Sequence, residues 1–145
     1  MRILSVDPGM RTGVALLDVP NDKPPTLVFH EEVYGGLPGF HEWWDVRPDY
    51  DVLVCEDYIP RRGVPGNVEP LKIIGYLMPF TPVLQSPAGR KKAVSDDVLK
   101  RLGLYLPGEP NRNAREAARH GIWWLKKQRH LPTLRVGWSH SNSTT

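Results

Sequence analysis

Residues 2–18 read RILSVDPGMRTGVALLD and decide the fold. Two apolar runs, 2–6 and 13–18, flank a short turn and predict the two strands of a buried hairpin. Asp7 ends the first run, where Pro8 fixes φ and Gly9 permits a sharp turn. A carboxylate held rigidly at the rim of a hairpin suits a metal ligand, although Asp-Pro-Gly is also an ordinary turn sequence.

A second acid ends another predicted strand. Residues 51–56 read DVLVCE, and the apolar run before Glu56 predicts a strand that is buried on both faces. Cys55 lies inside this run and is the one cysteine of the chain, so it is expected to be a core residue. Ligands bind at the carboxyl ends of strands in sheets that contain parallel strands, and this favours a functional Glu56 over a solvated loop residue.

A third acid lies in a helix predicted over 112–129. Alanine, glycine and leucine recur there at three- and four-residue spacing and predict a stripe of small residues that packs closely on the sheet. Asn113, Glu116 and His120 share the helix face that borders this stripe. The plainer alternative is that Glu116 is a surface acid paired with a neighbouring basic residue.

The remaining pattern predicts one α/β domain over 1–138 and a disordered polar tail over 139–145. No run resembles a signal peptide or a membrane span, so we expect a cytoplasmic protein, in the host cytoplasm if a phage encodes it. The predicted strands are 2–6, 13–18, 26–32, 51–56 and 82–84, and the predicted helices are 38–44, 69–78, 90–102 and 112–129.

Charge is unevenly distributed along the chain. Residues 1–89 contain 7 Lys and Arg against 12 Asp and Glu, whereas residues 90–135 contain 12 against 4. A basic segment beside an acidic metal site is what a nuclease needs, because Lys and Arg bind phosphates while carboxylates bind metals. The alternative is a set of solvated helix faces.

An acid after the first strand, another after the fourth and a third on the last helix suit phosphodiester chemistry with two divalent metals. This order resembles the RuvC family of Holliday junction resolvases, including phage-type relatives, within the RNase H-like superfamily. The matching stretches are 3–9 (ILSVDPG), 12–15 (TGVA), 52–56 (VLVCE), 87–94 (PAGRKKAV) and 116–120 (EAARH). The resemblance implies a five-stranded mixed sheet flanked by helices.

The resemblance also implies the chemistry. The protein would be a crossover junction endodeoxyribonuclease of DNA recombination and repair, a homodimer that binds branched DNA and two Mg²⁺ or Mn²⁺ ions per site. Lys91 is the expected catalytic lysine, although Lys92 beside it leaves the register open by one residue. Helix 69–78 is the candidate dimer interface. The expected metal-site residues are Asp7, Glu56, Asn113, Glu116 and His120, and the expected DNA-binding residues are Tyr58, Ile59, Arg61, Arg62, Arg90, Lys91, Lys92 and Arg119.

Two departures from the family concern the last helix. The family places Asp there, preceded three residues earlier by Asp or His, whereas this chain has Glu116 and Asn113. An amide oxygen binds a hard cation without contributing charge, so we expect weaker metal binding or an altered preference for Mn²⁺.

Other functions remain open. The same fold would serve a nuclease for flaps, RNA or RNA/DNA hybrids, such as a ribosomal RNA processing enzyme, or a catalytically weakened nucleic-acid-binding module. An actin-like ATPase also carries an Asp-x-Gly-x-x-Thr-Gly motif. It is disfavoured because 145 residues provide one lobe, which cannot enclose a nucleotide.

Overall fold

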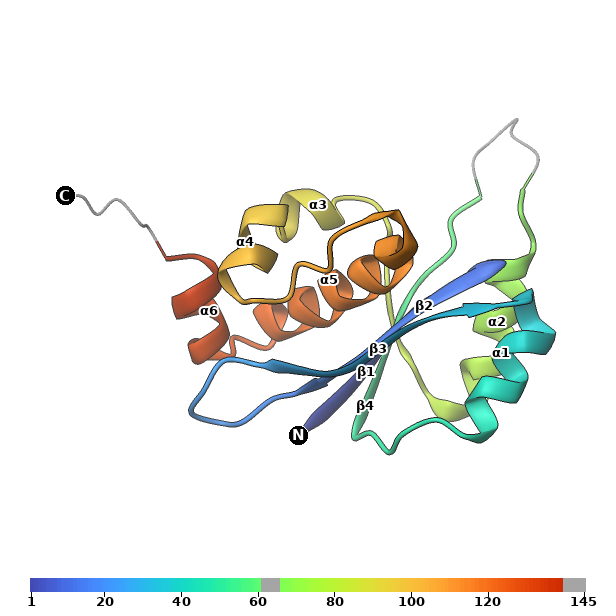
Figure 1. Cartoon of the computed structure of the whole chain (residues 1–145), viewed down its shortest axis with the longest axis horizontal. Helices are drawn as coiled ribbons and strands as arrows, with labels where there is room; N and C mark the ends of the chain where they lie inside the picture. The colour runs from blue at the N-terminus through green and yellow to red at the C-terminus, as the bar shows by residue number, and fades with distance from the viewer. Residues whose placement is uncertain (61–65, 140–145) are drawn as a thin grey trace.

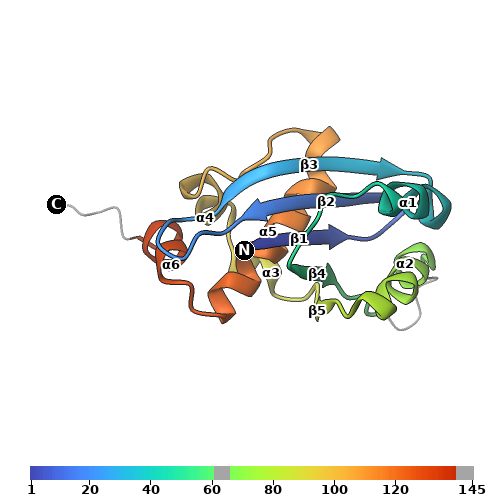
Figure 2. The same cartoon turned by 90° about the horizontal axis from the view of Figure 1, so that it is seen from below.

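The computed structural model describes residues 1–60 and 66–139. Its centre is a five-stranded mixed sheet in the order β3-β2-β1-β4-β5, with helices on both faces (Figures 1 and 2). β2 pairs antiparallel with β1 and β3, whereas β1, β4 and β5 run parallel. The strands are β1 (Arg2–Asp7), β2 (Arg11–Asp18), β3 (Thr26–Tyr34), β4 (Val52–Glu56) and β5 (Val83–Gln85). The predicted five-stranded mixed sheet is confirmed.

One face of the sheet is covered by α1 (Gly36–Asp45) and α2 (Glu69–Leu77), which continues into the 3-10 turn η1 (Met78–Phe80). Side chains alternate along a strand, so even-numbered residues of β1 and β2 point to this face. They pack with aromatic residues of α1 and aliphatic residues of α2. The strand and helix residues of this core include Leu4, Val6, Val14, Leu16, Phe40, Trp43, Trp44, Ile73 and Leu77.

The opposite face is crossed by α5 (Arg112–Lys127), which lies behind the strands in Figure 2. The small residues predicted for this helix allow a close approach. A Cβ added at Gly13 of β2 would lie 2.0 Å from the backbone carbon of Asn113, so only glycine fits there. The Ser5 hydroxyl donates to the backbone oxygen of Ala117 at 2.5 Å. The small-residue stripe is therefore confirmed as the sheet-facing side of α5.

Four shorter elements complete this layer: α3 (Arg90–Ala93), α4 (Asp96–Arg101), the 3-10 turn η2 (Glu109–Asn111) and α6 (Leu131–Gly137). The prediction of one helix over 90–102 is wrong, because Val94 and Ser95 are extended and Ser95 caps a new helix by accepting from the backbone N–H of Val98. α6 was not predicted, because its seven residues are too few for a clear apolar period.

No helix within residues 1–60 and 66–139 has both the length and the apolar character that a membrane crossing requires. Of the predicted tail over 139–145, Ser139 alone belongs to the described residues, and its hydroxyl donates to the backbone oxygen of Val136. The remainder of the predicted tail lies outside them.

Candidate active site

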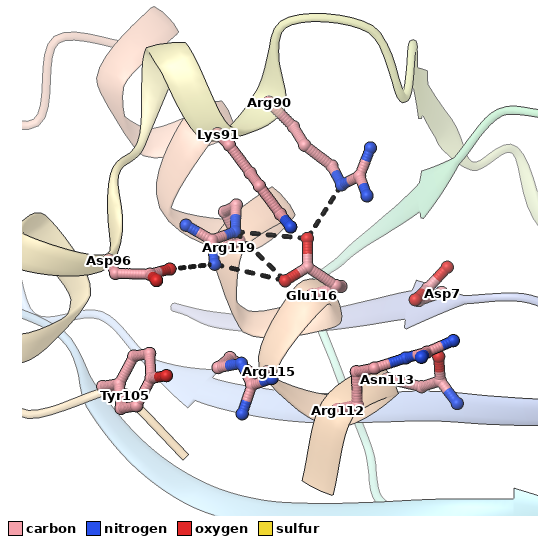
Figure 3. Close-up of a pocket in the computed structure, with 10 residues that line it drawn as sticks. All are labelled: Asp7, Arg90, Lys91, Asp96, Tyr105, Arg112, Asn113, Arg115, Glu116 and Arg119. Atoms are coloured by element: carbon pink, nitrogen blue, oxygen red, sulfur yellow. Dashed lines mark hydrogen bonds and ion pairs between the residues drawn. The ribbon is translucent and has the colours of Figure 1, made fainter. Parts of the chain in front are cut away.

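Three carboxylates reach one end of the sheet from three different elements. Val6 of β1 lies beside Cys55 of the parallel strand β4, so the next residues, Asp7 and Glu56, follow at neighbouring strand ends. Both side chains point to the face that α5 covers. Side chains two residues apart on a strand share a face, and Ile3 of β1 and Val54 of β4 pack in the core on the α5 side. Glu116 comes from the second turn of α5 and lines a pocket of about 280 Å³ together with Asp7 (Figure 3).

Asp7 lies where negative charge accumulates. Burial, followed by the charges of Glu56 and Glu116, raises the pKa of its carboxyl well above the ordinary value, and Arg90 offsets this only in part. Among the described residues, no donor forms a hydrogen bond with the Asp7 carboxylate. Within this part of the chain, Asp7 therefore lacks the hydrogen-bonding partners that its two neighbours have.

Glu116 is held by two arginines. Arg90 donates from Nε to Oε1 at 2.8 Å, and Arg119 donates to both carboxylate oxygens at 3.2 to 3.3 Å (Figure 3). Burial alone would raise the pKa of Glu116, but the bonds from Arg90 and Arg119 lower it. The alternative of a surface acid paired with a neighbouring basic residue is half met, because Glu116 pairs with Arg119 but is buried.

Arg119 does not have the position predicted for a DNA-binding residue. Its side chain is 1% exposed, and its guanidinium also donates to the backbone oxygen of Val94 and to the Asp96 carboxylate, each at 2.6 Å. Arg119 lines the pocket, but its guanidinium is engaged by these partners within the protein. It instead links the break between α3 and α4 to Glu116, and so holds the segment that carries Arg90 and Lys91 against α5.

Glu56 is held by a chain of buried polar groups. His120 contacts Glu56 Oε2 from Nε2 at 2.8 Å, and Gln85 Nε2 lies 3.0 Å from His120 Nδ1. The Gln85 amide is oriented by Lys127, which donates to its oxygen at 3.2 Å, so its NH₂ group faces the histidine. Nδ1 of His120 is then the acceptor, and Nε2 carries the proton that it donates to Glu56.

This tautomer changes the predicted role of His120. Both ring nitrogens are engaged, and the side chain is 0% exposed. His120 therefore lies behind Glu56 as an orienting group and does not have a free nitrogen for a metal ion. Gln85, which contributes this orientation from the end of β5, had no signal in the sequence beyond its place after a short apolar run.

Asn113 lines the same pocket as Asp7, as its helical spacing from Glu116 predicted. Its side-chain NH₂ donates to Glu32 Oε1 at 3.1 Å. Glu32 lies inside β3, next to the exposed Glu31, and had no strand-end signal of the kind that marked Asp7, so it was not predicted as a site residue. The structure thus adds a fourth acid at the border of the site.

Several of the residues that line the pocket are basic. Lys91 lines the pocket, and its side chain points toward Glu116 in Figure 3, whereas Lys92 is not among the lining residues. Arg112 and Arg115 line it from the first turn of α5. These two arginines were missed, although their spacing from Glu116 and Arg119 places all four on adjoining faces of one helix.

Tyr58 and Ile59 follow Glu56, and the resemblance implies that one of them is a hydrophobic wedge that opens base pairs at the crossover. Tyr58 is half-buried and packs against the core under α1 and α2, whereas Ile59 is 52% exposed. Ile59 also lines a surface pocket with Arg90, next to the active site. Arg61 and Arg62, which were predicted to bind DNA, lie outside the described residues.

Residues 1–60 and 66–139 contain no group of three His, Cys, Asp or Glu side chains already arranged to hold a metal ion. The Arg90 guanidinium lies between two of the three acids, 2.8 Å from Glu116 and 4.0 Å from Glu56. Three carboxylates from separate elements nevertheless form the hard oxygen donor set that Mg²⁺ and Mn²⁺ prefer. The residues present therefore fit divalent cations.

Comparison with solved structures confirms the predicted fold. Thermus thermophilus RuvC in complex with a Holliday junction substrate matches with a TM-score of 0.60 and 16% identity, over 91% of this chain and 98% of that chain. The fowlpox virus Holliday junction resolvase matches with a TM-score of 0.59 and 17% identity, over 88% of this chain and 99% of that chain. The sequence matches no protein-family model and no curated protein. The chain has the RuvC-type, RNase H-like fold.

Proposed function

We propose that this chain is a metal-dependent endonuclease that cuts four-way DNA junctions. The observation that carries the proposal is the meeting of Asp7, Glu56 and Glu116 beside a basic pocket, in the fold of RuvC and the fowlpox virus resolvase. Acids would hold the metals and bases would hold the phosphates on either side. This division matches the acidic and basic halves of the sequence.

The three carboxylates would hold two Mg²⁺ or Mn²⁺ ions, with Asn113 as a further oxygen ligand. When bound, these ions supply an activated water and neutralise charge on the leaving 3′ oxygen. His120 keeps the Glu56 carboxylate in one orientation, and Arg119 does the same for Glu116. Lys91 lies on the pocket wall, where its ammonium group would contact the scissile phosphate.

The DNA strand would follow the basic wall of the pocket. Arg112 and Lys91 are exposed and line the pocket, so their charges are accessible to phosphates that flank the cleaved bond. Arg90 would leave Glu116 for the phosphate when metal charge replaces its own. Ile59, exposed next to Arg90, is the better placed of the two wedge candidates for opening base pairs at the crossover.

A homodimer is part of the proposal, because paired cuts in a symmetric junction need two related sites. Helix α2 buries Ile73, Ile74 and Leu77 against the sheet and exposes a second apolar stripe on its outer side. This stripe consists of Val68 (55% exposed), Leu71 (54% exposed), Gly75 and Met78 (51% exposed). The spacing of three, four and three residues suits a helix pair across a two-fold axis.

The test is cleavage of labelled DNA with Mg²⁺ or Mn²⁺. The cleavage of a four-way junction, a flap, a linear duplex and an RNA/DNA hybrid of matched sequence is measured for the wild type and for Leu71→Glu. We expect paired cuts in the junction by the wild type, and a monomeric Leu71→Glu protein, measured by sedimentation, that no longer makes paired cuts. Equal cleavage of all four substrates would replace junction resolution with a general nuclease activity.

A catalytically weakened nucleic-acid-binding module is the second candidate. The observation that favours it is the hold of Arg90 and Arg119 on Glu116, which places two positive charges where metal charge is needed. Tight junction binding without cleavage in either metal would support this candidate and overturn the first.

A further inference from the structure

The N-terminus of α5 is held by a residue from a distant strand. Asn111, at the N-cap position, makes no capping bond through its side chain. The first turn of a helix leaves backbone N–H groups without partners, and a carboxylate is the favoured group to satisfy them. Glu32 of β3 supplies it, because it accepts from the backbone N–H of Asn113 at 3.4 Å and from that of Ala114.

Glu32 also determines how the Asn113 side chain lies. A carboxylate only accepts hydrogen bonds, so the Asn113 group that faces Glu32 at 3.1 Å must be its NH₂. The amide oxygen therefore lies on the other branch, away from Glu32, and Asn113 lines the pocket that contains Asp7 and Glu116. Among the described residues, no donor forms a hydrogen bond with this oxygen.

Glu32 is itself fixed in place. Its side chain is 7% exposed, and Arg11 of β2 pairs with it from Nε at 3.0 Å. The neighbouring contact between Gly13 and the Asn113 backbone leaves the first turn of α5 no room to move toward β2. The orientation of the amide is thus built into the packing of β2, β3 and α5.

We propose that Glu32 is a positioning residue of the active site, which turns the Asn113 amide so that its oxygen, and not its NH₂, is presented to the bound cation. The inference rests on the proposed metal-dependent function for its catalytic consequence. It also explains the departure from the family at residue 113. An Asp there would oppose the Glu32 carboxylate without a proton to share, so Asn113 and Glu32 form a matched pair.

An exchange of the two groups tests this pairing. In Glu32→Gln/Asn113→Asp the net charge is unchanged, and the Gln NH₂ can donate to the Asp carboxylate, but it then replaces the oxygen that accepts from Arg11 Nε and from the backbone N–H of residue 113. We expect Asn113→Asp alone to lower the thermal midpoint of the metal-free protein by about 3 °C or more. The exchange variant should regain part of this loss and bind Mn²⁺ at least as tightly as the wild type, measured by calorimetry.

Removal of the carboxylate gives the second arm. Glu32→Ala frees the Asn113 amide, so we expect Mn²⁺ binding about tenfold or more weaker. Glu31→Ala changes the neighbouring exposed acid on the same strand and should alter neither property.

Additive losses of thermal midpoint in the exchange variant, or unchanged Mn²⁺ affinity in Glu32→Ala, would overturn the inference. A wild type that binds Mn²⁺ but cuts no nucleic acid would overturn the proposed function. The thermal midpoints and the Mn²⁺ affinities would still test the role of Glu32, because neither measurement depends on cleavage.

Discussion

The face of the sheet under α1 and α2 is filled with aromatic and aliphatic side chains, whereas the face under α5 also buries Arg119, His120, Gln85 and Glu116. Phe40 packs its ring 5.7 to 6.3 Å from the centroids of Trp43, Trp44 and Tyr76. On the α5 side, by contrast, the residues that contact the sheet are mostly small, and hydrogen-bonded polar groups surround them.

The apolar face under α1 and α2 mainly stabilises the fold, whereas the polar groups under α5 mainly orient the carboxylates of the site. Burial of apolar rings stabilises the fold directly, because it removes apolar surface from water. Burial of a charged group costs its solvation free energy, and the attraction to its partner does no more than offset this cost. Buried ion pairs are therefore weak evidence for stability. The buried polar groups under α5 instead hold Glu56 and Glu116 in fixed orientations. We therefore expect substitutions on the two faces to affect different measurements.

The largest effect is expected from Asp7→Asn, which removes charge at the centre of the three acids. The cleavage rate should fall by at least about 10²- to 10³-fold, the range for loss of one electrostatic group that stabilises a transition state. Binding of a four-way junction should persist, because it depends on the basic residues around the pocket. Single-turnover cleavage and an equilibrium binding assay measure the two properties, and near wild-type cleavage would show that Asp7 is not a site residue.

Phe40→Ala should give the largest loss of stability. Removal of a fully buried ring leaves a cavity and should lower the free energy of unfolding by about 3 to 5 kcal/mol. The cleavage rate per folded molecule should stay within about twofold, because Phe40 lies on the face of the sheet opposite the three carboxylates. Urea unfolding measures the first property, and Tyr34→Ala, at a ring that is 65% exposed, is the matched control. A large fall in the cleavage rate would show that the two faces are coupled.

His120→Ala tests the polar chain behind Glu56. If Glu56 is a metal ligand, as proposed, loss of its outer partner should lower cleavage or metal affinity by about 10- to 100-fold, while junction binding stays unchanged. His41→Ala, at an exposed histidine on α1, should have no effect. Gln85→Leu retains the imidazole and its bond to Glu56, and removes the Gln85 bonds to His120 Nδ1, to the His120 backbone oxygen and to Lys127, so its defect should be smaller. An equal defect in both variants would indicate general disruption and not the orientation of Glu56.

The smallest effect concerns the metal-free protein. Asp7 has a raised pKa when folded, so its stability contribution is complete below the ordinary value of 3.8 and is lost as pH rises through the raised pKa. An amide at this position cannot ionise, so the Asp7→Asn variant should have the higher thermal midpoint at neutral pH in EDTA. The difference should shrink toward about pH 4. Asp22→Asn, at an exposed turn residue, is the control, and a constant difference with pH would exclude this cause.

The acids at strand ends were predictable because their signals are local. Asp7 and Glu56 each follow an apolar run, and the alternation of such runs indicates where a strand ends. Glu116 was recognisable from its helical spacing and its place in the family order. The division of helix 90–102 also had a local signal, since Ser95 precedes two acids as an N-cap does, but the apolar spacing across it concealed the break.

The buried polar pairs were not predictable in the same way. Arg119 was expected on the surface because arginine is almost never fully buried without partners. Its partners, Asp96 and the Val94 carbonyl, lie more than 20 residues away in the sequence. The contact of His120 with Glu56 spans 64 residues, and that of Ala114 with Glu32 spans 82.

The sequence by itself determined the five strands, helix α5 with its small-residue stripe and the positions of the three acids, because each depends on neighbours within a few residues. Only the tertiary structure decided which arginine or histidine side chain contacts which acid, and which way the Asn113 and Gln85 amides point. Those choices depend on strand register and on how closely α5 approaches the sheet. A shift of one residue in register would turn a strand-end side chain to the other face and change every such pair.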